Sequence, residues 1–130
     1  MKTINAYELI NRQENGLPTI IIDAREESEQ YVFEFINVRE ELPLAGNVFV
    51  AKRCMPSELS KIGAKIQHWC ENTEGAIVVV TCTRHIKYCE RIGLIVTPFT
   101  NVGVDARGLT PSVYEWFNAN FQRKITKAAL

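Results

Sequence analysis

Short, almost wholly apolar runs alternate along the chain with longer segments in which apolar residues recur at helical spacing. The runs at 18–25 (PTIIIDAR), 47–51 (NVFVA) and 75–81 (GAIVVVT) are rich in β-branched residues, and a last strand is expected at 99–106 (FTNVGVDA). Continuously apolar strands are typical of a parallel sheet that is covered on both faces. The pattern therefore predicts buried strands rather than the alternation of a half-exposed sheet.

The segments between these runs predict helices. Asn5 and Glu8 form a capping-box pattern, in which each side chain bonds the backbone N–H of the other residue, at the start of a helix over 5–16. The longest helix is expected at 56–72, where apolar residues recur every three or four positions. Further helices are expected at 26–35, at 86–96 with Pro98 as its stop, and after Thr110 as N-cap and Pro111 as the first helical residue.

Strands and helices thus alternate along the chain. This order predicts an α/β fold with a mostly parallel central sheet and helices on both faces. A length of 130 residues suits one domain, and a hydrophobic content of 46% is typical of a packed chain rather than a disordered one. We expect a single domain over 1–130, in which the basic tail 122–130 frays.

The charge balance and the apolar runs limit the classes of partner. Lys plus Arg number 15 and Asp plus Glu number 15, so the chain lacks the excess positive charge of a general nucleic-acid or anionic-membrane binder. No apolar run approaches the ~20 residues that span a bilayer, and the N-terminal segment lacks the apolar core of a signal peptide. We therefore expect a cytoplasmic protein with no nucleic-acid or membrane partner.

Four cysteines and two histidines could in principle hold a metal or form disulfides. In a reducing compartment the cysteines should be thiols, and none of them forms a C-x-x-C pair or a zinc-ligand spacing with a histidine. We therefore predict no metal and no cofactor. Cys70 beside Trp69 is interpreted as a core residue, and the sequence permits an exposed Cys54, for which it suggests no role.

Cys82 has the most suggestive surroundings of the four cysteines. It ends the most convincing strand, and ligands of open parallel sheets gather beyond the carboxyl ends of the strands. Basic residues follow it at 84, 85 and 87, no carboxylate lies between Thr81 and Cys89, and a helix is expected to begin nearby. Cations and helix N-termini stabilise a thiolate. The alternative interpretation is a small buried cysteine at a strand end.

The order of the motifs resembles the rhodanese-like family of sulfurtransferases. The segment 5–31 resembles the family's opening: a helix, a strand ending in Asp-x-Arg (Asp23, Arg25), and a second helix bearing an aromatic, here Tyr31. LPLAGNVFVA resembles the segment that follows, AIVVVTC the strand that ends on the active-site cysteine, and NVGVDARGL the last strand and its glycine turn. The resemblance covers nearly the full length and implies a three-layer rhodanese-like domain.

The resemblance also implies a chemistry. The cysteine at position 82 would accept sulfane sulfur from a small anionic donor such as thiosulfate, and the persulfide would pass it to cyanide or to a thiol, including a protein thiol. Backbone N–H groups of the loop would surround the persulfide. The substrate-binding residues would then be Thr83, Arg84, His85, Ile86, Lys87 and Tyr88.

Four residues outside this loop are candidates for a supporting role. Asp23 and Arg25 could orient the rim of the site, although a structural ion pair is the favoured interpretation, and Arg107 could reach an anionic substrate or be solvated. Asp105, Arg107 and Gly108 lie at the end of the expected last strand. Cys89 could resolve an oxidised or persulfidated Cys82 if the helix began early, or it could simply face the core.

The loop departs from the family pattern in its lack of a glycine. The family loop commonly contains a glycine, which turns easily with positive φ, whereas the segment 82–87 contains none and Ile86 resists that geometry. The departure favours a catalytically inactive binding or regulatory module as the alternative function. A third hypothesis is a cysteine phosphatase or arsenate-reductase-like enzyme, but such loops usually end in arginine, where Tyr88 stands here.

Overall fold

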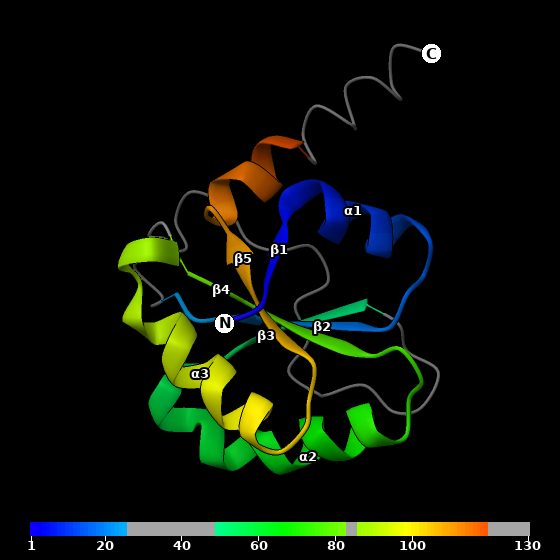
Figure 1. Ribbon diagram of the computed structural model, residues 1–130, viewed down its shortest axis with the longest axis vertical. Helices are drawn as coiled ribbons and strands as arrows, with labels where there is room; N and C mark the ends of the chain where they lie inside the picture. Colours follow the sequence, from blue (N-terminus) through cyan, green and yellow to red (C-terminus); the bar gives the residue numbers. More distant parts are fainter. Residues whose placement is uncertain (26–48, 83–85, 120–130) are drawn as a thin grey trace.

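The computed structural model describes residues 1–25, 49–82 and 86–119 of the chain (Figure 1). Predictions for the helix at 26–35 and for the tail at 122–130 lie outside these residues. Within the described part, no helix is long and apolar enough to cross a membrane. In chain order the elements are β1 (Thr3–Asn5), α1 (Ala6–Glu14), β2 (Thr19–Asp23), β3 (Phe49–Arg53), the 3-10 helix η2 (Pro56–Glu58), α2 (Leu59–Glu71), β4 (Ile77–Thr81), the 3-10 helix η3 (Ile86–Tyr88), α3 (Glu90–Asn101), β5 (Ala106–Thr110) and a helical segment at 113–119.

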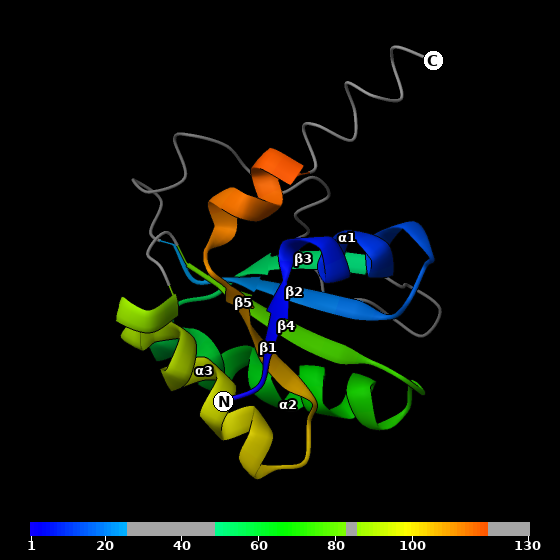
Figure 2. The same ribbon diagram turned by 45° about the horizontal axis from the view of Figure 1, so that its top comes forward.

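The five strands form one parallel sheet in the order β1-β5-β4-β2-β3. All five residues of β2 and of β4 are buried, as their continuous apolar runs predict. Helices α2 and α3 cover one face, and α1 and the helical segment 113–119 cover the other (Figure 2). The predicted three-layer α/β architecture is therefore confirmed.

Side-chain alternation along the strands divides the core into two halves. Ile20 and Ile22 of β2 face α2 and α3, whereas Ile21 between them faces α1. The same alternation in β4 sends Val78 and Val80 to the first half. Since both halves are apolar, the fold needs the unbroken runs of β-branched residues that the sequence supplies.

The start of the chain confirms one prediction and adds an element. The Asn5 side chain accepts a hydrogen bond from the Glu8 backbone N–H at 2.9 Å, and the Glu8 carboxylate accepts one from the Asn5 N–H at 3.3 Å, which completes the predicted capping box. Strand β1 precedes this cap and was not predicted. Only Ile4 of its three residues is buried, paired opposite Leu109 of β5, so the strand is too short to give a periodic pattern.

The segment around Pro98 differs from the prediction. Helix α3 continues through Pro98 to Asn101, and the last strand is Ala106–Thr110 rather than 99–106. Packing explains the difference, because Phe99 extends the helical series of buried residues Ile92, Ile95 and Val96. An exposed proline forfeits one helical hydrogen bond, and the burial of Phe99 offsets part of that loss.

The start of the C-terminal helical segment also differs from the prediction. Its first helical residue is Val113, and the Ser112 hydroxyl accepts the Tyr114 N–H at 3.3 Å, so Thr110 and Pro111 do not begin it. A side-chain oxygen that accepts a first-turn N–H is the hallmark of an N-cap. Thr110 instead ends β5, opposite Asn5 of β1.

Gly108 of β5 is predicted to tolerate no side chain. A Cβ at this position would lie 2.5 Å from Cδ1 of Ile86 and 3.0 Å from Cγ2 of Ile92. We expect Gly108→Ala to lower the free energy of unfolding in urea by about 1–3 kcal/mol, as overpacking does. The matched control is Gly93→Ala in α3, where a Cβ would meet nothing within 4 Å and helix propensity favours alanine. Equal stability changes in the two variants would contradict the prediction.

Candidate functional site

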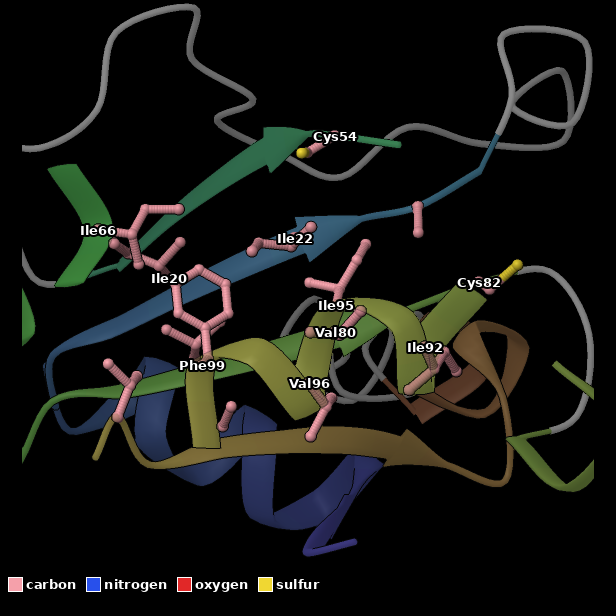
Figure 3. Packing of buried hydrophobic residues seen from close by; sticks show 14 of the residues in the cluster. Ile20, Ile22, Cys54, Ile66, Val80, Cys82, Ile92, Ile95, Val96 and Phe99 are labelled. Atoms are coloured by element: carbon pink, nitrogen blue, oxygen red, sulfur yellow. The ribbon is translucent and has the colours of Figure 1, made fainter. Parts of the chain in front are cut away.

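Cys82 directly follows β4, which has β5 on one side and β2 on the other. Its side chain belongs to the half of the core that α2 and α3 cover, and only 2% of the residue is exposed. Figure 3 shows its sulfur beyond the end of the strand, pointing away from Ile95 and Phe99. The structure thus places the thiol at the carboxyl edge of the sheet, where the sequence predicted it.

The side chain of Arg91 contacts this thiol. Its Nη1 lies 3.7 Å from Sγ of Cys82 and donates a hydrogen bond of 3.2 Å to the carbonyl oxygen of Ala24. Arg91 is half-buried and is the second residue of α3. No role was predicted for it from the sequence. The signal that could have found it is a cation in the first turn of a helix, where the helix dipole disfavours positive charge.

The turn after β2 carries a buried ion pair. Oδ1 of Asp23 accepts a hydrogen bond from Nε of Arg25 at 2.9 Å and from its backbone N–H at 3.2 Å, and Oδ2 accepts one from Nη2 at 2.8 Å. Both side chains are almost completely buried. Strand alternation directs Asp23 to the face opposite Cys82, so the pair does not line the thiol. It fixes the turn whose Ala24 carbonyl holds Arg91.

The end of the cysteine loop is bound to the chain after β5. The Ile86 N–H donates to the carbonyl of Pro111 at 2.7 Å, and the Cys89 N–H donates to the carbonyl of Ile86 at 3.4 Å. These two amides therefore do not converge on the sulfur of Cys82. Lys87 is exposed within η3, and Tyr88 ends η3. Thr83, Arg84 and His85 lie outside the described residues.

The other cysteines differ from Cys82 in their surroundings. Cys89 is the N-cap of α3 and is half-buried. Because α3 begins only at Glu90, the helix does not begin early, which was the condition for Cys89 to act as a resolving thiol for Cys82. Cys54 is buried rather than exposed, and its thiol donates to the Met55 carbonyl at 3.3 Å. None of the four cysteines forms a disulfide. No group of three or more His, Cys, Asp or Glu side chains within the described ranges is arranged to hold a metal.

Cys70 lines a pocket of about 500 Å³ together with residues of the segments 71–76 and 103–105. Burial, followed by the charges of Asp105 and Glu71, raises the pKa of its thiol to about 11. A thiol with such a pKa is protonated at neutral pH and is a poor nucleophile. Since Ala76 and Asp105 precede β4 and β5, the pocket lies at the amino end of the sheet, opposite Cys82.

Arg107 also lies away from Cys82, contrary to the strand-end position expected for it. It is the second residue of β5, and it pairs with Asp105, which precedes the strand: both nitrogen–oxygen distances are 3.0 Å. The misplaced strand boundary explains the error, since a strand over 99–106 would have put both residues at its carboxyl end. The structure therefore brings Arg91, and not Arg107, to the thiol.

The Asp105–Arg107 pair predicts a pH dependence of stability. The hydrogen bond from Arg107 lowers the pKa of Asp105 below 3.8, although partial burial opposes this. A lowered pKa stabilises the fold above about pH 4, and that contribution is lost as the pH falls through the folded-state pKa. We expect Asp105→Asn to lower the free energy of unfolding by about 0.5–1 kcal/mol near pH 7, and by less near pH 2.5. Urea titrations at both pH values test this; an equal loss at both would contradict it.

Comparison with known proteins identifies the fold. The sequence matches no model of a protein family. No curated protein is significantly similar to it in sequence. Among solved structures, it is similar to a rhodanese-like domain protein from Staphylococcus aureus, with 21% sequence identity, a TM-score of 0.59, and 89% of this chain and 91% of that chain covered. With the parallel sheet and its two helical layers, this similarity shows that the chain has the rhodanese-like fold, as the order of its motifs predicted.

Proposed function

We propose that the protein is a sulfurtransferase that carries sulfane sulfur as a persulfide on Cys82. The observation that supports this most directly is the contact between the Cys82 thiol, which forms no disulfide, and the Arg91 guanidinium at the carboxyl edge of the sheet. A cation beside a cysteine favours the thiolate, which is the nucleophilic form. The other two buried or half-buried thiols differ: the Cys54 thiol donates to the Met55 carbonyl, and the Cys70 thiol is held protonated.

The proposed reaction balances without an external oxidant. The Cys82 thiol releases its proton to solvent, and the thiolate attacks the outer sulfur of thiosulfate. A bond forms between Sγ and that sulfur while the sulfur–sulfur bond of thiosulfate breaks, and its electron pair leaves with sulfite. Cyanide or an acceptor thiolate then attacks the outer sulfur of the persulfide, and the electron pair of the broken bond returns to Sγ.

A second candidate is a rhodanese-like module that binds a partner without catalysis. Two observations favour it: the Ile86 N–H is directed to the Pro111 carbonyl, and the Cys82 residue is almost fully buried. An enzyme needs its thiol to reach the donor, whereas a binding module does not. The enzyme should therefore turn over thiosulfate, and the binding module should not.

A steady-state assay with thiosulfate and cyanide separates the candidates. We expect thiocyanate to form at a rate proportional to protein concentration and to saturate with thiosulfate. No release above the buffer rate would support the binding module. An aryl phosphate in a parallel assay tests the phosphatase hypothesis, and we expect no hydrolysis, because Tyr88 stands where such loops have arginine.

A further inference from the structure

Arg91 occupies a position that a helix does not favour for a cation. Cys89 is the N-cap of α3 and makes no side-chain capping bond, so Arg91 lies within the exposed positive end of the helix dipole. Its guanidinium is nevertheless held in place by the Ala24 carbonyl. A positive group held at this position, with its Nη1 3.7 Å from a buried sulfur, is placed to stabilise negative charge on that sulfur.

We propose that the Arg91 guanidinium is the counter-charge of the Cys82 sulfur and stabilises it as a thiolate and as an anionic persulfide. The thiolate part of this inference stands without sulfur transfer, whereas the persulfide part rests on the proposed function. Arg91 is then a catalytic residue, since Nη1 lies against the reacting atom at 3.7 Å. It is also a residue for which the sequence resemblance offers no role.

The shape of the guanidinium suits this double contact. The same nitrogen, Nη1, contacts both the Ala24 oxygen and the Cys82 sulfur, and the planar fork is fixed when one of its contacts is an immobile backbone oxygen. The Ala24 turn is itself fixed on both sides: its N–H donates to Thr81 at 2.9 Å, and the Asp23–Arg25 pair closes it. The cation is thus preorganised rather than drawn in from solvent.

Two backbone amides of the loop do not supply the same charge stabilisation. The resemblance predicts that loop amides surround the sulfur, but the amides of Ile86 and Cys89 are bonded to carbonyl oxygens. Burial makes an unpaired anion costly, so a thiolate at this depth needs a positive or hydrogen-bonding partner. The Arg91 guanidinium, 3.7 Å from the sulfur, supplies such a partner.

Other charged groups on the surrounding elements act less directly. Asp23 and Arg25 neutralise each other on the opposite face of the sheet. Arg53, Lys87 and Glu90 are exposed, so solvent screens their charges. The pH response of the thiol should therefore follow Arg91 more closely than any of these groups.

Alkylation of Cys82 by iodoacetamide, measured by peptide mass spectrometry over pH, tests the inference without requiring turnover. We expect Arg91→Gln, which keeps an N–H donor for Ala24 but no charge, to slow alkylation about tenfold at pH 7. The rates should converge at high pH, where the thiol ionises in any case. Arg91→Lys should fall between the two, and Arg107→Gln, a matched arginine at the far end of the sheet, should follow the wild type.

Three results would overturn the inference: an unchanged pH profile in Arg91→Gln, a slowing that is equal at every pH, or an Arg91→Lys variant no better than Arg91→Gln. Circular dichroism and urea unfolding of each variant establish that it folds. The two proposals fail separately. If the wild type forms no persulfide but Arg91→Gln shifts the pH profile of alkylation, the proposed function fails and the counter-charge role of Arg91 stands. If the wild type transfers sulfur but Arg91→Gln leaves the pH profile unchanged, the proposed function stands and the counter-charge role fails.

Discussion

Asp23→Ala is expected to lower the free energy of unfolding by about 3–5 kcal/mol, the cost of leaving one partner of a buried ion pair without the other. The carboxylate of Asp23 accepts three hydrogen bonds from Arg25, two from its side chain and one from its backbone, and both residues are almost fully buried. Removing the carboxylate leaves the Arg25 guanidinium charged in a site of low dielectric. Urea unfolding at pH 7 measures the loss.

A double variant separates the role of the charges from that of the shape. Replacing both residues by apolar side chains, as in Asp23→Leu with Arg25→Met, should recover most of the stability, since no charge then remains buried. The turn would lose the bonds that fix the Ala24 carbonyl, so the contact between Arg91 and Cys82 should loosen. A loss below about 1 kcal/mol in Asp23→Ala would show that the pair is not buried as described.

Cys82→Ala is expected to reduce thiocyanate formation at least ~10³-fold, to the rate of the uncatalysed reaction, because the variant has no atom on which the persulfide can form. Stability should change little, since alanine removes only the small sulfur atom from this site. Activity is measured with saturating thiosulfate and cyanide, and folding by circular dichroism of the same sample.

Cys54→Ala and Cys70→Ala are the matched controls. Each removes a thiol by the same substitution, and both variants should keep the wild-type rate. Cys54 donates to the Met55 carbonyl, and burial raises the pKa of Cys70 to about 11, so neither thiol is prepared for nucleophilic attack. Loss of activity in either control with full activity in Cys82→Ala would reassign the site.

The sequence predicted the central part of the fold because that part depends on local pattern. Strands β2 and β4 are buried at every position, and a short run of β-branched residues strongly favours a buried strand over other secondary structures. The capping box of α1 needs only Asn5 and Glu8 at the right spacing. The order of strands and helices then left little freedom for the topology.

Tertiary contacts decided the parts that were not predicted. Helix α3 passes Pro98 because Phe99 has a place in the core. Strand β5 has the unpromising sequence ARGLT, which is stable between two strands because Arg107 pairs with Asp105 and Gly108 makes room for Ile86. None of these contacts is visible in a local window of the sequence.

The candidate site also has one part that the local sequence predicts and one part that depends on tertiary contacts. The position of Cys82 follows from its place after a buried strand, which the sequence shows directly. Its contact with Arg91 joins residues nine positions apart, and it depends on where α3 begins and on the carbonyl of Ala24, sixty-seven positions from Arg91. Helical spacing could not reveal that contact, because α3 begins only at Glu90.

Sulfur transfer through Cys82 can be tested by the mass of the Cys82 peptide after the reduced protein has been incubated with thiosulfate and separated from it. We expect a gain of one sulfur atom on Cys82, which cyanide removes with release of an equal amount of thiocyanate. An unchanged mass at Cys82, or a gain confined to Cys54, Cys70 or Cys89, would contradict it.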